Sequence, residues 1–202
     1  MPSIYGLKPR FQALLRPFTA FLARHGVTAN QVTIVAALLS FVVGIAILLD
    51  PEPGPFLLAV PAVLLVRMAL NAIDGMLARE FGQQSRLGAV LNELGDVVAD
   101  AALYLPFALI WNLNHALVVV VVVLGIIGEM AGVVAVQVGA ERRYDGPMGK
   151  SDRAFVFGLL GLLLGLGVAA GPWTTILLAV VAALGIGTIF NRSRRALQAV
   201  AA

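Results

Sequence analysis

The chain has 202 residues, of which 60% are hydrophobic and only 12% are charged, and its formal net charge is +3. A soluble domain of this length carries about twice that charged fraction, so the composition excludes an ordinary soluble protein and indicates an all-α, polytopic membrane protein. Disulfide bonds are excluded because the chain contains no cysteine.

Residues 7–24 predict a helix that precedes the membrane spans. Apolar side chains recur there at helical spacing, with basic residues between them. This pattern is typical of an amphipathic helix in the membrane interface, and we expect a bend at Pro17. Thr28 and Gln31 then have the spacing of a capping box, in which each side chain bonds the backbone of the other. They predict the start of the first span.

Six apolar stretches are long enough to cross about 30 Å of hydrocarbon as helices. We find no internal repeat and no linker that would divide the chain, so we expect one integral membrane domain over residues 1–202. The six predicted spans are residues 31–49, 55–73, 87–111, 115–137, 154–171 and 173–190.

The basic residues predict the orientation of these spans. Lys and Arg gather before the first span, in alternate loops and in the tail, whereas the opposite loops around residues 50–54, 112–115 and 171–172 contain neither. By the positive-inside rule, both termini lie in the cytoplasm. The basic balance is thereby explained by topology and anionic lipid, with no need for nucleic acid as a partner. We expect an integral protein of a bacterial cytoplasmic membrane.

A polar motif interrupts the second and third spans. It reads Asn71-x-x-Asp74-Gly75-x-x-Ala78-Arg79, then eight residues, then Gly88-x-x-x-Asn92-x-x-x-Asp96. Ionisable groups inside a membrane are costly, so they are functional candidates by default. Buried Asn and Asp can also serve only to hydrogen-bond neighbouring helices. The number of polar and small residues at fixed offsets across two spans favours a functional site.

The oxygen-bearing side chains of this motif predict a site for Mg²⁺ or Mn²⁺. Asn71 and Asp74 share a helix face, while Asn92, Asp96 and further acids follow one stripe of the next span. Hard divalent cations prefer such oxygen ligands and neutralise a diphosphate in phosphoryl transfer. Because Asn carries no charge, neighbouring acids would have to supply the missing negative charge. The predicted metal ligands are Asn71, Asp74, Asn92, Glu93, Asp96 and Asp100.

This motif resembles the signature of the CDP-alcohol phosphatidyltransferase family, in which Asp stands at the positions of Asn71 and Asn92. The resemblance extends to the six-span layout and the amphipathic lead-in. It implies a phospholipid-synthesis transferase that moves a phosphatidyl group from CDP-diacylglycerol to an alcohol and releases CMP. It also implies that Asp96 is the catalytic base, that Asp74 binds metal, and that Arg79 contacts the donor phosphate.

Small and basic residues complete the predicted substrate site. Gly75, Ala78 and Gly88 would let the donor approach the helix backbones. A Gly-Lys-Ser-Asp-Arg run opens the fifth span, where Lys150 and Arg153 with helix N-terminal amides would bind a phosphate on the acceptor.

Three further features leave alternatives open. Arg67 either lines the acceptor pocket or forms a buried ion pair with Glu129. The glycines of the fifth span indicate close helix packing, within the chain or between the protomers of a homodimer. The two Asn also allow a non-catalytic relative that binds CDP-lipid, and a membrane transporter is the alternative from another class. A transporter favours broken helices and repeats, which the sequence does not show.

Overall fold

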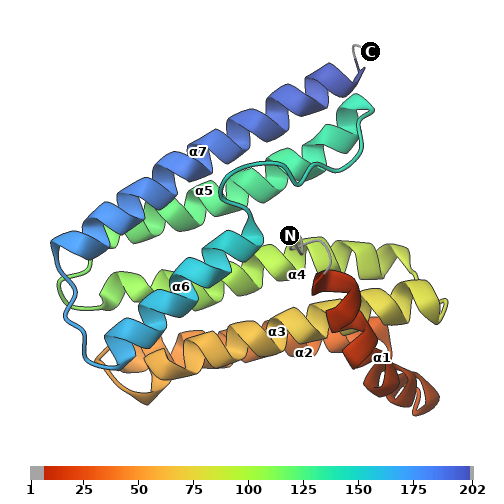
Figure 1. The fold of residues 1–202 in the computed structure, drawn as a ribbon, viewed down its shortest axis with the longest axis horizontal. Helices are drawn as coiled ribbons and strands as arrows, with labels where there is room; N and C mark the ends of the chain where they lie inside the picture. Colours follow the sequence, from red (N-terminus) through yellow and green to blue (C-terminus); the bar gives the residue numbers. More distant parts are fainter. Residues whose placement is uncertain (1–6, 201–202) are drawn as a thin grey trace. The chain divides into compact units, whose positions relative to one another are not determined.

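The computed structural model describes residues 7–200. Within this range every regular element is helical, so the all-α prediction is confirmed (Figure 1). The α-helices are α1 (Leu7–Arg24), α2 (Ala29–Leu49), α3 (Pro55–Glu80), α4 (Arg86–Tyr104), α5 (His115–Val134), α6 (Lys150–Gly165) and α7 (Pro172–Val200), and the 3-10 helices are η2 (Leu105–Leu109) and η3 (Ala135–Val138).

Four segments of the described chain are long and apolar enough to cross a membrane: α2, α3, α5 with η3, and α7. The protein is therefore an integral membrane protein. The other two predicted spans, which contain α4 and α6, do not meet this criterion, for two different reasons. The polar side chains of α4 lower its hydropathy, and its α-helix ends at Tyr104, before Pro106 in η2. Helix α6 has only 16 residues, about 24 Å at 1.5 Å per residue. The count of six spans stays a prediction.

The described residues form two compact units: residues 7–41 with 62–99, and residues 42–61 with 100–200. We call them the first and second unit. The prediction of one membrane domain over the whole chain stays a prediction.

Apolar packing of α1, α2 and α3 forms the core of the first unit. Its buried residues are Ala29, Val32, Ile73, Met76 and Leu77, with Leu15 and Leu22 of α1 packed against them. The ends of α1 and α3 are also tied by an ion pair, because the Arg16 guanidinium donates from Nε and Nη2 to the two Glu80 carboxylate oxygens at 3.0 Å each. Helix α1 begins and ends as predicted, while its place in the membrane interface stays a prediction.

The start of α2 is fixed by the predicted capping box. The Thr28 backbone N–H donates to Gln31 Oε1 at 2.9 Å, and the Gln31 N–H donates to Thr28 Oγ1 at 3.3 Å. Gln83, from the loop after α3, holds the same end: its Oε1 accepts from the Ala29 N–H at 2.7 Å, and its Nε2 donates to the Val27 carbonyl at 3.3 Å. Gly82 allows this loop to turn because its φ is +67°.

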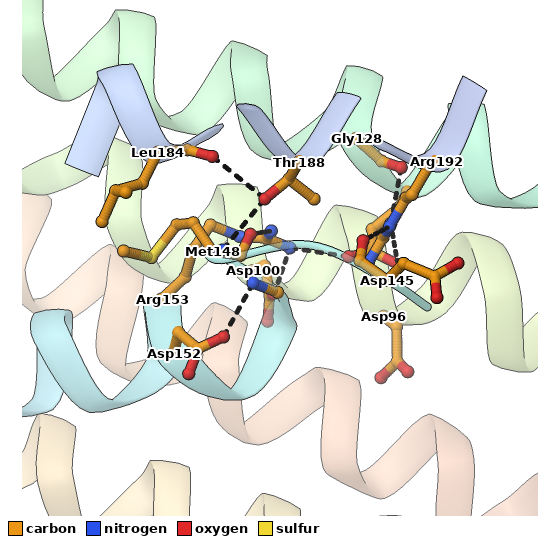
Figure 2. A network of polar contacts seen from close by, with 12 residues as sticks. Asp96, Asp100, Gly128, Asp145, Met148, Asp152, Arg153, Leu184, Thr188 and Arg192 are labelled. Atoms are coloured by element: carbon orange, nitrogen blue, oxygen red, sulfur yellow. Dashed lines mark hydrogen bonds and ion pairs between the residues drawn. The ribbon is translucent and has the colours of Figure 1, made fainter. Parts of the chain in front are cut away.

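In the second unit, α5 and α7 lie side by side (Figure 1). Glu129 of α5 is buried among three arginines. It accepts from Arg153 at 3.1 Å and Arg142 at 3.4 Å, and Arg192 Nη1 lies 3.3 Å from its Oε2. The Arg192 guanidinium also donates to the carbonyls of Gly128 and Asp145 (Figure 2). The network joins α5, α6 and α7.

Two glycines of the fifth predicted span, Gly161 and Gly165, pack closely within the chain. A Cβ at Gly161 would lie 2.9 Å from the Leu57 carbonyl oxygen, and one at Gly165 would lie 2.8 Å from Leu58 Cγ. These two glycines therefore let α6 approach the start of α3. Contact between protomers stays a prediction.

Candidate functional site

A polar cavity of about 630 Å³ lies in the first unit. Its walls come from α2, α3, the loop after α3 and the first turns of α4, so the two halves of the sequence motif meet there. The lining residues are Ala29, Asn30, Thr33, Asn71, Asp74, Gly75, Ala78, Arg79, Gln83, Gln84, Ser85, Arg86, Gly88, Ala89 and Asn92.

Amide and carboxylate side chains of the motif pair crosswise between α3 and α4. Asn71 Nδ2 of α3 donates to Asp96 Oδ1 of α4 at 3.1 Å, and Asn92 Nδ2 of α4 donates to Asp74 Oδ2 of α3 at 3.5 Å. The Thr33 hydroxyl of α2 donates to the same Asp74 oxygen at 2.8 Å. Each carboxylate thus accepts a hydrogen bond from a neutral asparagine. In a relative with four aspartates, a negatively charged aspartate would stand at the position of each asparagine.

Arg67 is a buried cation beside the motif. Its side chain is 4% exposed, and its Nη2 lies 3.8 Å from Asp96 Oδ1. A guanidinium inside a membrane helix is costly unless a counter-charge is near, and Asp96 provides that charge. The structure places Arg67 beside Asp96 and places three arginines around Glu129. The two roles suggested for Arg67, in the acceptor pocket or as a partner of Glu129, stay predictions.

The small residues of the motif leave room for polar side chains of the cavity. A Cβ at Gly75 would lie 2.7 Å from Arg79 Nη2, so the Arg79 guanidinium lies over the α3 backbone one turn before its own position. A Cβ at Gly88 would lie 2.7 Å from Asn30 Oδ1 and 2.9 Å from Ser85 Oγ. Ser85 Oγ also accepts from the Gly88 N–H at 2.9 Å and caps α4. The predicted contact of these glycines with a substrate stays a prediction.

Three of the predicted site residues, Asp100, Lys150 and Arg153, belong to the second unit. Arg153 is 5% exposed; its Nη2 lies 3.1 Å from Glu129 Oε1 and 3.9 Å from Asp100 Oδ2. Figure 2 shows Arg153 beside Asp100 and Met148. Two carboxylates thus already balance this guanidinium, and one of them is the Asp100 expected to supply charge to the metal. Glu93 is half-buried on α4. The roles predicted for these four residues stay predictions.

The sequence reasoning missed several polar residues of the cavity wall: Asn30, Thr33, Gln83, Gln84, Ser85 and Arg86. Asn30 and Thr33 stand three apart at the start of an apolar span, so they share a helix face. That spacing could have indicated that both line the cavity. No local pattern indicates the role of Gln83, because its hydrogen bonds to Val27 and Ala29 join segments more than fifty residues apart.

The donor atoms around the cavity fit a hard divalent cation. Asp74, Asp96, Asn71, Asn92 and Thr33 all offer oxygen, the ligand that Mg²⁺ and Mn²⁺ prefer. Their negative charge is low, however, with only two carboxylates among them. In keeping with this, residues 7–200 contain no group of three or more His, Cys, Asp or Glu side chains placed to hold a metal ion.

The motif residues that line the cavity of this all-helical membrane protein include the carboxylate of Asp74, the amides of Asn71 and Asn92, and the guanidinium of Arg79. A guanidinium beside oxygen ligands for a cation suits a phosphorylated ligand. The comparison with known families specifies the class. The chain belongs to the CDP-alcohol phosphatidyltransferase family, whose model matches residues 26–191 and so includes both halves of the motif.

Individual proteins are also similar to this chain in sequence or in fold. The chain is 46% identical over 195 residues to the inner membrane protein YnbA of Escherichia coli, covering 96% of each protein. Its fold is similar to that of the Mycobacterium tuberculosis phosphatidylinositol phosphate synthase PgsA1, at 22% identity. The TM-score is 0.71 for the structure with CDP-DAG bound, over 91% of this chain and 92% of that one. It is 0.74 for the complex with manganese and citrate, over 90% and 88%.

Proposed function

We propose that the protein transfers a phosphatidyl group from CDP-diacylglycerol to an alcohol and releases CMP, in a bacterial cytoplasmic membrane. The observation that carries this proposal is the cavity of the first unit in a chain of this family. Asp74, Arg79 and Asn71 line the cavity, and Asn71 donates a hydrogen bond to Asp96. The structure of PgsA1 with CDP-DAG supports the choice of donor.

Residues in and beside the cavity would have different roles in the reaction, namely donor binding and proton transfer. Arg79 carries a planar guanidinium that can bind two phosphate oxygens of the donor at once. Asp96 would take the proton of the acceptor hydroxyl as that oxygen attacks the phosphatidyl phosphorus. The bond from this phosphorus to the bridging oxygen then breaks, and CMP leaves with that oxygen.

A divalent cation completes the proposed site. Asp74 would hold Mg²⁺ or Mn²⁺ together with the amide oxygens of Asn92 and Asn71, and Asp96 lies next to them through its bond to Asn71. Such an ion neutralises the diphosphate and stabilises the leaving oxygen. The PgsA1 complex with manganese supports this assignment.

The experiment that tests the proposal measures CMP release. Full-length protein in lipid nanodiscs is supplied with CDP-diacylglycerol, Mg²⁺ or Mn²⁺, and a panel of alcohols that includes inositol phosphate, glycerol phosphate and serine. We expect metal-dependent CMP release with at least one acceptor. A protein that binds CDP-diacylglycerol but releases no CMP with any acceptor would contradict the enzyme and support a non-catalytic lipid-binding relative, which the two Asn also allow.

A further inference from the structure

We infer that Gln83 is a positioning residue of the proposed active site. Its side-chain amide holds the first turn of α2 in the rotation that brings Asn30 and Thr33 into the wall of the cavity. The inference rests on the proposed function, since it concerns the same cavity. It gives a role to a residue in the eight-residue gap between the two halves of the motif.

The first step is the match between the Gln83 amide and the start of α2. Gln83 Oε1 accepts from the Ala29 N–H at 2.7 Å, and its Nε2 donates to the Val27 carbonyl at 3.3 Å. The first N–H of a helix has no acceptor within that helix, so Gln83 supplies one. Both bonds require a side chain with a donor and an acceptor, and glutamine carries the two on one planar amide.

The second step is the attachment of Gln83 itself. Its backbone N–H donates to the carbonyl of Leu77 in α3 at 3.4 Å, and the preceding Gly82 turns the chain with a φ of +67°. Leu77 is fully buried in the apolar core of the first unit. The Gln83 side chain therefore extends from a point fixed to α3 and ties the start of α2 to that helix.

The third step is what this tie adds to apolar packing. Ala29 and Val32, two buried residues at the start of α2, pack on the end of α3. Apolar contact has no preferred direction, so it fixes the distance between the helices more firmly than the rotation of α2 about its own axis. Hydrogen bonds are directional, and the two bonds from Gln83 to the backbone therefore fix that rotation.

The fourth step is the consequence for the cavity. Asn30 and Thr33 line it from α2. The Thr33 hydroxyl donates at 2.8 Å to Oδ2 of Asp74, the carboxylate proposed to hold the metal ion. Asn30 faces the start of α4, where a Cβ at Gly88 would lie 2.7 Å from its Oδ1. Rotation of α2 would move both side chains, so Gln83 acts on donor binding through them.

Gln83→Met tests this role, because methionine has the length of glutamine without its amide donor and acceptor. Full-length protein in nanodiscs is measured for deuterium exchange at the Ala29 amide, for the Kd of CDP with Mg²⁺, and for CMP release. In Gln83→Met we expect faster exchange at Ala29 and a Kd for CDP that is about 3–10-fold higher, the equivalent of one lost hydrogen bond. The KM for CDP-diacylglycerol should rise by the same factor, whereas kcat should change much less.

The matched control is Gln31→Met, the same substitution at a glutamine that caps the same end of α2. Gln31 is exposed, and its Oε1 accepts from the Thr28 N–H at 2.9 Å. Its hydrogen bonds with Thr28 stay within the first turn, so the control weakens the helix cap and keeps the tie to α3. A lower melting temperature with the wild-type Kd for CDP is expected for this variant.

Unchanged exchange at Ala29 in Gln83→Met would overturn the inference. A wild-type Kd for CDP in that variant, or an equal rise of the Kd in Gln31→Met, would also overturn it. If Gln83→Met does not fold, Gln83→Asn, whose amide is too short to reach both backbone groups, is held to the same expectations.

The same measurements separate this inference from the proposed function. Wild-type protein that neither binds CDP nor releases CMP would contradict the proposed function, and exchange at Ala29 would still decide whether Gln83 holds the start of α2. Metal-dependent CMP release by the wild type, with unchanged exchange in Gln83→Met, would contradict this inference alone.

Discussion

At the scale of single residues, Asp96 is the most direct test of the proposed chemistry. Asp96→Asn keeps the size and polarity of the side chain and can still accept from Asn71, but it cannot take a proton from the acceptor. General base assistance is typically worth about 10²–10⁴-fold in rate, so we expect CMP release to fall by that factor in protein that still folds. The melting temperature should also fall, because the variant removes a carboxylate beside the buried Arg67 guanidinium. Wild-type turnover in a folded Asp96→Asn protein would exclude Asp96 as the base.

Arg79 tests the donor side of the cavity. Lysine keeps the positive charge but loses the planar fork that grips two phosphate oxygens. Losing one charge-assisted hydrogen bond costs about 1.5 kcal/mol, so in Arg79→Lys we expect the KM for CDP-diacylglycerol to rise about tenfold. The KM for the acceptor should change little. An effect confined to the acceptor KM would contradict the assignment of Arg79 to the donor phosphate.

At the scale of helices, Gly44 of α2 marks a close backbone approach. A Cβ there would overlap the carbonyl oxygen of Ala102 in α4, so alanine forces the two backbones apart. We expect Gly44→Ala to lower the free energy of unfolding by about 1–3 kcal/mol. The matched control is Gly128→Ala in α5, where the nearest atom is 3.9 Å from the added methyl. Alanine is the better helix former, so this control should keep or raise stability. Equal destabilisation by both would refute the packing argument.

The sequence could predict the positions of helices better than the contacts between them. Hydropathy and helical periodicity placed α1, and Thr28 and Gln31 placed the start of α2, because these signals depend on neighbours within a few residues. The spacing of Asn71, Asp74 and Asn92 also predicted that they would meet in one cavity. The partner of Arg67 was not predictable, since Asp96 lies on another helix and depends on how α3 and α4 are rotated against each other. The arginines around Glu129 were not predictable either, because they come from other helices and a loop.

At the scale of the whole molecule, a buried ion-pair network around Glu129 joins three helices of the second unit. Glu129→Gln would leave Arg142, Arg153 and Arg192 with less counter-charge in a buried site. Breaking such a network typically costs about 3–5 kcal/mol, and we expect a loss of that size in the free energy of unfolding. The exposed pair of Arg16 with Glu80 is the control: Glu80→Gln should leave the melting temperature nearly unchanged. Full stability of the Glu129→Gln protein would show that the network does not hold α5, α6 and α7 together.

The loop between η3 and α6 is attached to α7 by a related contact. Partial burial of Asp145 acts against its charge, but hydrogen bonds from Arg195 and Arg143 outweigh it and hold the pKa of this carboxyl below its ordinary value. A carboxyl with a lowered pKa in the folded state stabilises above its unfolded pKa and loses that effect as the pH falls through the folded one. The contact is therefore present at neutral pH, where it joins α7 to the loop that leads to Lys150 and Arg153.

The orientation in the membrane is the last prediction, and the absence of native cysteine makes it directly testable. The positive-inside rule with six spans places the loops that lack Lys and Arg outside the cell and the basic loops in the cytoplasm. Single cysteines would be labelled in intact spheroplasts with a membrane-impermeant maleimide, before and after permeabilisation. We expect labelling from outside for Glu52→Cys, Asn112→Cys and Gly171→Cys, and labelling only after permeabilisation for Gln84→Cys, Glu141→Cys and Arg194→Cys. If α4 or α6 did not span, Asn112→Cys or Gly171→Cys would change side relative to Glu52→Cys. Labelling of Gln84→Cys in intact cells would contradict the cytoplasmic placement of the cavity, where the proposed reaction must meet its acceptor and release CMP.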